Sequence, residues 1–357
     1  MFYDVIIIGG GPAGATFARL APSDSKILLL DGSPLRSGGK GKPCGGLLAP
    51  DAQKIIGRFG MKIPSEVLTD PQIDYVKTVD YRSGIIRNYG RTYINISRPR
   101  FDEWLLSLCG ENTEVRIGVC NGISRTEKGF EIRYRTEAGD TVTAGCGYLV
   151  GADGASSVVR RFAYPKAKPR MYTAVQQRFR DDGAKPLYSC IFDEEITDCC
   201  SWTISKSGYT VFGGAYPMDR PRERFEEQKK RLEKFGYDFR EPFETECCTV
   251  LRPRSGRDFF LGNDGVFLIG EAAGFVSPSS LEGISYAMRS GAALASAMRR
   301  KNPERAYRRE TFGLRAKLIR KTLKCPFMYQ PTLRRAVMKS GLMSIKRDFC
   351  DGAEKTK

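Results

Sequence analysis

The chain has 357 residues, of which 41% are hydrophobic, and a formal net charge of +17. A chain of this length buries a substantial core in one large or two closely joined domains. It contains no histidine, which excludes histidine-based acid–base catalysis, and its eleven cysteines lack the spacing of a zinc site, so we expect no metal. No apolar run reaches the ~18 residues of a membrane-spanning helix, and we expect a cytoplasmic protein with reduced thiols.

The N-terminal segment predicts a unit of strand, turn, helix and strand. Residues 3–8 and 26–31 are apolar runs typical of buried parallel strands, and residues 13–20 predict the helix between them. The turn has GxGxxG spacing, in which one glycine turns sharply, the next admits a pyrophosphate and the last lets helix pack on strand. Asp31 ends the second strand, where its carboxylate can accept hydrogen bonds from adenosine ribose hydroxyls. The predicted dinucleotide-binding residues are Gly9, Gly11, Pro12, Ala13, Gly14, Asp31 and Gly32.

The later elements alternate between two patterns. Residues 33–46 predict a loop rich in glycine, lysine and proline, and residues 114–119, 130–134 and 141–150 predict a strand meander. Residues 172–251 predict an aromatic-rich antiparallel sheet, interrupted by a charged helix at 221–235. A buried strand at 266–269 and a helix at 283–300 return to the N-terminal pattern.

These patterns predict a nucleotide-binding domain that is discontinuous in sequence. We expect it to comprise residues 1–70, 96–170 and 252–300. Residues 71–95 and 171–251 would form a substrate domain, and residues 301–357 a basic helical C-terminal region.

Two further glycine-containing segments follow predicted strands. Asp153 and Gly154 lie in residues 151–160, and Gly270 and Glu271 lie in residues 267–275. These segments resemble the DG motif and the third FAD fingerprint, usually GDAAG, of the flavoprotein hydroxylase and geranylgeranyl reductase superfamily. The resemblance implies that FAD is the cofactor and that Asp153 supports the dinucleotide site. A simple Asp-Gly turn is the alternative for Asp153.

The third fingerprint departs from the usual family pattern. Glu271 stands where the family has aspartate, in the loop that the resemblance implies holds the ribityl chain of FAD. The additional methylene shifts the carboxylate by about one bond length, which puts this contact in doubt. Gly283 and Ile284, at the start of the following helix, belong to the same predicted cofactor site.

Two more segments carry the resemblance. Lys42, Cys44 and Gly45 lie in a loop similar to the cysteine-containing loop that geranylgeranyl reductases place beside the flavin ring. A thiol there could donate a proton to substrate or form a flavin adduct, and an inert buried cysteine is the alternative. Arg98 begins an R-x-x-F-D-x-x-L segment, in which the family's arginine approaches FAD; a surface arginine is the alternative.

Trp202 stands where geranylgeranyl reductases carry a Y-x-W-x-F-P substrate motif, of which only the tryptophan is unchanged. The segment is also similar to the W-x-W-x-I-P motif of flavin halogenases, with the first tryptophan and the proline missing. We assign Trp202 and Cys44 as candidate catalytic residues. A core position is the alternative for the tryptophan.

The resemblance covers nearly the whole chain and is closest to the CbrA-type branch. It implies an α/β, p-hydroxybenzoate hydroxylase-like architecture, with a Rossmann-like FAD-binding domain, an antiparallel-sheet substrate domain and a helical C-terminus. It further implies an FAD-dependent oxidoreductase that reduces double bonds of a polyprenyl or isoprenoid lipid, with NAD(P)H or ferredoxin as the reductant. The alternatives are an FAD monooxygenase or halogenase acting on an aromatic substrate, and a non-catalytic FAD-containing lipid-binding protein.

The positive charge is concentrated near the C-terminus, where residues 299–347 contain sixteen lysines and arginines against two glutamates. Such a segment predicts an anionic partner such as the inner face of a membrane, or else a solvated helical face. It lacks the interleaved aromatic residues of a nucleic-acid stacking surface, so we expect no nucleic acid. Interfacial contact and packing against the rest of the chain are both consistent with its apolar positions Leu314, Leu318, Ile319, Leu323 and Phe327.

Overall fold

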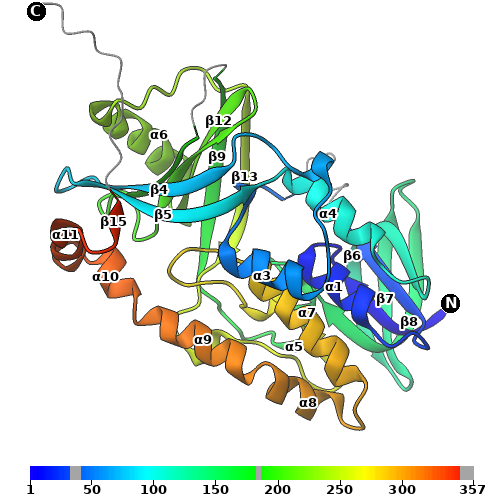
Figure 1. The fold of residues 1–357 in the computed structure, drawn as a ribbon. Coiled ribbons are helices and arrows are strands. Elements are labelled where there is room, and N and C mark those ends of the chain that lie inside the picture. The colour runs from blue at the N-terminus through cyan, green and yellow to red at the C-terminus, as the bar shows by residue number, and fades with distance from the viewer. Residues whose placement is uncertain (33–41, 182–185, 346–357) are drawn as a thin grey trace, which may run out of the picture.

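The computed structural model describes residues 1–32, 42–181 and 186–345, which form two β-sheets and a surrounding set of helices (Figure 1). Part of the predicted loop at 33–46 and the end of the predicted region 301–357 lie outside the described residues. No helix within these ranges is both long and apolar enough to cross a membrane. All ten cysteines in these ranges are free thiols.

The first sheet has a parallel core that continues into an antiparallel meander. β1 pairs in parallel with β2 and β8, β2 with β6, and β8 with β14, whereas β7 is antiparallel to both β6 and β8. Ile8 lies beside Leu30 and Gly151, so the loops that follow these three strands open on one edge of the sheet. The strands are β1 (Phe2–Ile8), β2 (Ile27–Asp31), β6 (Thr113–Thr126), β7 (Gly129–Thr136), β8 (Thr141–Gly151) and β14 (Val266–Leu268).

Helices cover this first sheet and approach each other closely. A Cβ added to Gly291 on α7 would lie 2.5 Å from the Ala13 carbonyl oxygen of α1, so glycine is needed where these two helices cross. The helices outside the C-terminal region are α1 (Pro12–Leu20), α3 (Pro50–Arg58), α4 (Arg98–Ser107), α5 (Val158–Ala163), α6 (Pro221–Leu232) and α7 (Ile284–Met298).

The second sheet is mainly antiparallel, as predicted, but it contains one parallel pair, β4 with β10. Phe212 and Tyr216 of β12 pack against Phe225 and Leu232 of α6, so this helix covers one face of the sheet. The strands are β3 (Leu47–Leu48), β4 (Ile73–Asp80), β5 (Ile86–Asn95), β9 (Met171–Arg180), β10 (Tyr188–Phe192), β11 (Ser201–Lys206), β12 (Tyr209–Pro217), β13 (Glu244–Leu251) and β15 (Ser344–Ile345).

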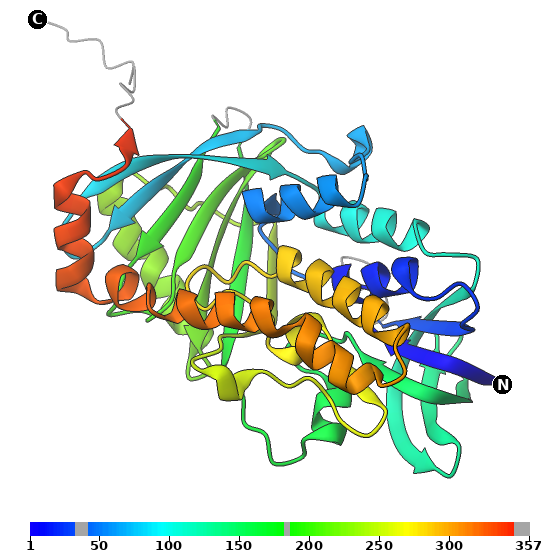
Figure 2. The same ribbon diagram turned by 60° about the horizontal axis from the view of Figure 1, so that its bottom comes forward.

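Residues 303–345, which we call the C-terminal strap, run from the first sheet to the second (Figure 2). Leu314 and Leu318 are buried in the core of the first sheet, whereas Ile319 is exposed. At its far end β15 pairs with β5, a contact that the predicted helical C-terminus did not include. The strap helices are α8 (Pro303–Glu310), α9 (Phe312–Thr322), α10 (Cys325–Tyr329) and α11 (Pro331–Ser340).

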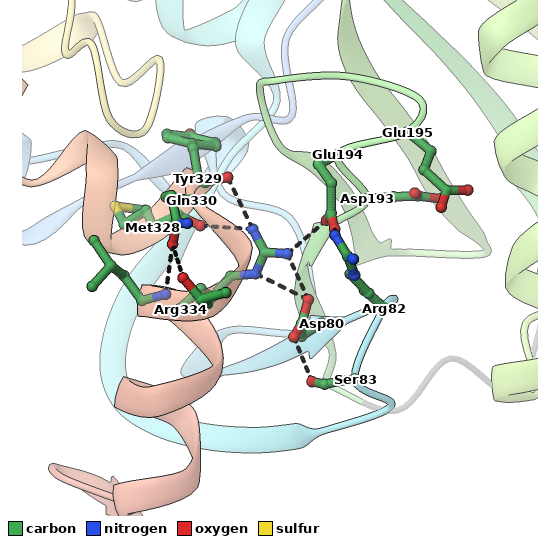
Figure 3. Close-up of polar contacts among 12 residues, drawn as sticks. Asp80, Arg82, Ser83, Asp193, Glu194, Glu195, Met328, Tyr329, Gln330 and Arg334 are labelled. Atoms are coloured by element: carbon green, nitrogen blue, oxygen red, sulfur yellow. Dashed lines mark hydrogen bonds and ion pairs between the residues drawn. The ribbon is translucent and has the colours of Figure 1, made fainter.

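A buried ion cluster fixes the strap to the second sheet (Figure 3). Arg334 on α11 donates from Nε and Nη2 to Oδ1 of Asp80, at 3.0 and 2.6 Å. Its Nη2 also donates to Glu194 at 2.8 Å, and its Nη1 donates to the Met328 carbonyl oxygen at 3.1 Å. Because several acceptors satisfy one buried guanidinium, this point of attachment is specific.

Candidate functional site

Loops at the edge of the first sheet and one face of the second sheet enclose a cavity of about 330 Å³. Ligand and cofactor sites are typically concave, with a few convergent polar groups. Sixteen of the eighteen predicted site residues line the cavity, so the structure brings together segments that are distant in sequence. They are Gly9, Gly11, Pro12, Ala13, Asp31, Gly32, Lys42, Cys44, Gly45, Arg98, Asp153, Gly154, Trp202, Glu271, Gly283 and Ile284.

The glycine turn before α1 combines two crowded positions with an open one. A Cβ added to Gly14 would lie 2.0 Å from the Gly9 carbonyl oxygen, and a Cβ added to Gly9 would lie 2.4 Å from the Ala152 carbonyl oxygen. A Cβ on Gly11 would instead point into open space. Because Gly11 caps the N-terminus of α1, the open space lies where unpaired helix N–H groups favour an anion.

Two predicted residues, Gly14 and Gly270, do not line the cavity. Gly270 begins the short helix η4 (Gly270–Ala273), and a Cβ there would lie 2.7 Å from the Cβ of Ala13. Its N–H donates to the Ser290 hydroxyl at 2.8 Å. Both glycines are therefore packing positions that bring neighbouring segments close to α1.

Asp153 combines a local capping role with a place in the cavity wall. Its Oδ2 accepts hydrogen bonds from the N–H groups of Val158 at 2.6 Å and Val159 at 3.4 Å, at the start of α5. Its Oδ1 is buried and has no hydrogen-bond partner within the described residues. Burial raises the pKa of Asp153. A hydroxyl donor entering the cavity would satisfy this oxygen.

Glu271 is held by contacts with distant parts of the chain. One of its carboxylate oxygens forms an ion pair with Lys42, and the other accepts the Leu251 N–H at 2.9 Å. Burial lowers the pKa of Lys42, but the Glu271 carboxylate outweighs this effect, so the pKa lies above its usual value. The pair joins the Cys44 loop to η4 across the cavity wall, a contact that the sequence did not predict.

Lys206, on β11, holds the loop that contains Cys44 in place through hydrogen bonds. It was not among the predicted site residues. Its buried ammonium donates to the carbonyl oxygens of Gly46 at 3.1 Å and Ile96 at 2.9 Å, and to the side-chain oxygen of Asn95. Cys44 accepts the Gly46 N–H at 3.4 Å. Because three acceptors from two segments share one cation, Lys206 fixes the position of this loop relative to β11.

The titration of Lys206 gives the chain a pH-dependent stability. Burial lowers the pKa of Lys206 to about 7, whereas a lysine in the unfolded chain titrates near ~10.4. Between these values the unfolded chain binds the proton more tightly, so this residue makes the free energy of unfolding rise with pH. We expect Lys206→Met to flatten that rise in urea unfolding measured from pH 7 to 10, and equal slopes for both proteins would contradict it.

Arg98 and Asp102 form an ion pair one helical turn apart at the start of α4, with Nε and Oδ1 2.8 Å apart. Burial lowers the pKa of Arg98, but the Asp102 carboxylate raises it more, so the guanidinium stays charged. The Cys44 side chain also raises the pKa of Arg98. Asp102 lines the cavity too, although the sequence did not predict a role for it.

Aromatic side chains line the end of the cavity formed by the second sheet. Tyr93 and Tyr188 make an edge-to-face contact with ring centroids 5.1 Å apart. The Nε1 of Trp202 is buried without a hydrogen-bond partner in the described part of the chain. A Cβ on Gly45 would lie 3.7 Å from this nitrogen, so the Cys44 loop and Trp202 belong to the same wall.

Comparison with known proteins places the chain among flavoenzyme folds. No family model matches the chain. A geranylgeranyl bacteriochlorophyll reductase-like protein from Thermoplasma acidophilum superposes with a TM-score of 0.70 at 20% identity, covering 97% of this chain and 88% of that one. PqsL, a probable FAD-dependent monooxygenase from Pseudomonas aeruginosa, superposes with a TM-score of 0.66 at 17% identity, covering 95% of this chain and 100% of that one.

These similarities confirm the predicted fold class, an α/β fold of the p-hydroxybenzoate hydroxylase type with a helical C-terminus. At these identities the reductase-like and monooxygenase folds are equally compatible with the chain. A closer relative is the protein CbrA of Escherichia coli, which is 47% identical over 349 residues, covering 96% of this chain and 94% of that protein. The chain therefore belongs to the CbrA family.

Proposed function

We propose that the chain is an FAD-dependent oxidoreductase that reduces carbon–carbon double bonds of a polyprenyl or isoprenoid lipid. The observation that carries the proposal is that Cys44 and Trp202 line the same cavity as the glycine turn before α1. The similarity to the reductase-like fold from T. acidophilum supports it. Bound FAD would supply hydride-transfer chemistry, and the protein would supply position and a dry site.

The cavity residues fit FAD as the cofactor. The open position at Gly11 leaves room for a pyrophosphate on the N-terminus of α1, and Asp31 lines the cavity at the end of β2. The unpaired Oδ1 of Asp153 suits a cofactor hydroxyl, and Arg98 suits a phosphate or a ring face. Lys42 and Glu271 would position the flavin end of the cofactor.

The side chains around Cys44 suit proton delivery to a substrate carbon. The Cys44 thiol lies in the cavity wall, where it would hold the proton, while Lys206 fixes its loop through Gly46. Tyr93 and Tyr188 would exclude water from the same space because their rings pack edge to face.

Cys44→Ser tests this arrangement. In the absence of oxygen, we expect prenyl lipid to reoxidise the dithionite-reduced flavin of the wild-type protein, with two hydrogens added per reduced double bond. The variant should retain FAD and react about tenfold more slowly, since water replaces the thiol only in part. Cys247→Ser, at an exposed thiol, is the control. Stopped-flow flavin absorbance and product mass measure the effect, and equal rates for Cys44→Ser and wild type would remove the thiol from the mechanism.

An FAD monooxygenase or halogenase-like enzyme acting on an aromatic substrate is the second candidate. The aromatic end of the cavity, with Tyr93, Tyr188 and Trp202, favours it because aromatic rings stack on a planar substrate. Substrate-dependent oxygen consumption would support this candidate against prenyl reduction. Reduced flavin that neither prenyl lipid nor oxygen reoxidises would instead indicate a non-catalytic FAD-containing lipid-binding protein.

The proposal extends to partners, location and domain division. We propose NAD(P)H or ferredoxin as the reductant, and a cytoplasmic protein that meets an isoprenoid substrate at the inner face of a membrane.

In this proposal residues 1–70, 96–170 and 252–300 bind FAD, and residues 71–95 and 171–251 bind substrate. Limited proteolysis with and without FAD tests the division, which predicts cofactor-dependent protection in the first set of residues.

A further inference from the structure

The C-terminal strap carries half of the large apolar side chains that the described residues expose. Eighteen such side chains are exposed, and nine of them lie in residues 312–345. The same part of the chain holds the excess of lysine and arginine. An exposed apolar surface combined with one sign of charge is typical of an interaction site rather than of a solvated helix face.

Four of these side chains form one continuous apolar stripe, namely Phe312, Ile319, Leu323 and Phe327, with exposed fractions of 68%, 42%, 70% and 55%. Their spacing of seven, four and four residues places them on one face of a helix. Leu323 and Lys324 join α9 to α10 and keep right-handed helical backbone angles, so the chain direction changes little between the two helices. Leu314 and Leu318 are buried in the core and anchor the strap. The side chains of the apolar stripe are therefore not needed to hold the strap in place.

Cations accompany the stripe along its length. Arg309, Arg320 and Lys324 are exposed and stand three residues before Phe312, directly after Ile319 and directly after Leu323. The structure records no ion pair for these three side chains with any acidic residue it describes. They are therefore available to an anionic surface that also accepts apolar side chains, which is the chemistry of a bilayer with anionic lipids.

The strap also contacts a wall of the cavity. Tyr329 donates its hydroxyl hydrogen to the Ser279 carbonyl oxygen at 2.8 Å, and the Cys325 sulfur lies 3.6 Å from the Pro278 carbonyl oxygen. The residues that follow, Ser280 and Leu281, line the cavity. A partner surface bound to the stripe would therefore be separated from the candidate substrate site only by the loop that contains these residues.

We propose that the apolar stripe, with Arg309, Arg320 and Lys324, is a docking surface for an anionic membrane. This inference rests on the membrane location included in the proposed function and names the residues that carry it, and its test requires no turnover. Because the stripe is a row of protruding side chains on a helix, it fits insertion into a headgroup layer. Each basic residue near an anionic leaflet should strengthen binding about fivefold at low salt.

Vesicle flotation of the full-length protein tests the proposal. We expect the wild-type chain to float with vesicles of phosphatidylglycerol and phosphatidylcholine, weakly or not at all with phosphatidylcholine alone, and less as salt rises. The double variant Leu323→Glu with Phe327→Glu should bind at least about tenfold more weakly, because it places charge in the headgroup layer. Both side chains are exposed, so the variant should fold and retain FAD.

A matched control separates the stripe from a general charge effect. Met218→Glu with Phe243→Glu makes the same change in charge at apolar side chains that are 55% and 50% exposed outside the strap. We expect this control to bind vesicles like the wild type. Equal loss of binding in both double variants would indicate a general charge effect and would overturn the proposal. No flotation of the wild type with anionic vesicles would also overturn it and would favour an acidic protein as the partner. Flavin content in the same samples reports separately on the proposed enzymatic function.

Discussion

Replacing Arg334 with methionine is expected to lower the free energy of unfolding by about 3–5 kcal/mol. The substitution leaves the buried Asp80 carboxylate without the two hydrogen bonds that it accepts from the guanidinium, and it also releases Glu194 (Figure 3). Breaking one partner of a buried ion pair costs this much because the remaining charge is uncompensated. Urea unfolding followed by tryptophan fluorescence measures the change.

Two further variants show whether the orphaned charge is the cause. Arg335→Met removes the exposed neighbouring guanidinium and should change the free energy of unfolding by no more than about 0.5 kcal/mol. Asp80→Asn in the Arg334→Met background removes the uncompensated carboxylate and should recover part of the lost stability. If Arg334→Met and Arg335→Met prove equally stable, the ion cluster does not hold the strap to the second sheet.

Replacing Gly11 with valine is expected to raise the dissociation constant for FAD by about 100-fold or more without unfolding the chain. The Gly11 backbone is extended, with φ of −67° and ψ of −176°, and its Cβ direction is open, so valine fits the protein. The added side chain would occupy the space required by the pyrophosphate. Each hydrogen bond to a charged group contributes about 1.5–3 kcal/mol, so the loss of two accounts for this factor. Quenching of FAD fluorescence on titration measures the affinity.

The other glycines provide the contrast. Gly57→Val, on an exposed surface of α3 with open space around its Cβ, should leave FAD affinity unchanged. Gly14→Val should prevent folding, because the first side-chain atom would lie 2.0 Å from the Gly9 carbonyl oxygen. Unchanged FAD affinity in a folded Gly11→Val protein would mean that the cofactor does not lie on this helix N-terminus.

The parts of the fold that the sequence predicted are those determined by local patterns. The apolar runs of β1 and β2, the glycine turn and the helix between them follow from residues adjacent in the chain. The meander of β6, β7 and β8 was predicted from alternating residues separated by short turns, and its pairing is confirmed. Similarity to family motifs also predicted Cys44 and Asp153 as site residues, and the structure places both in the lining of one cavity.

The residues that the sequence did not reveal act through distant partners. Lys206 lies on the same face of β11 as Trp202, but a lysine by itself normally indicates exposure, whereas this one is buried against Asn95 and Gly46. Arg334 belongs to a basic segment that predicted either an anionic partner or a solvated helical face, yet it is the buried partner of Asp80, 254 residues away. No local pattern encodes such pairs, because the partner is determined only by how the two sheets are arranged.

The apolar positions of α9 and α10 confirm packing against the rest of the chain for part of the segment, whereas contact with a membrane interface stays a prediction. Leu314 and Leu318 pack into the core, as expected for a helix against the domain, whereas Ile319, Leu323 and Phe327 remain exposed. Hydrophobicity alone could not separate these sets, because the division depends on which side of the strap meets the first sheet.

The most direct test of the account is titration of the purified full-length protein with FAD. We expect one FAD bound per chain, with a shifted flavin absorbance spectrum, because segments that are separated in sequence converge on one cavity. A protein that is purified colourless and binds no FAD after incubation with excess cofactor would contradict the proposed site, and the proposed reduction with it.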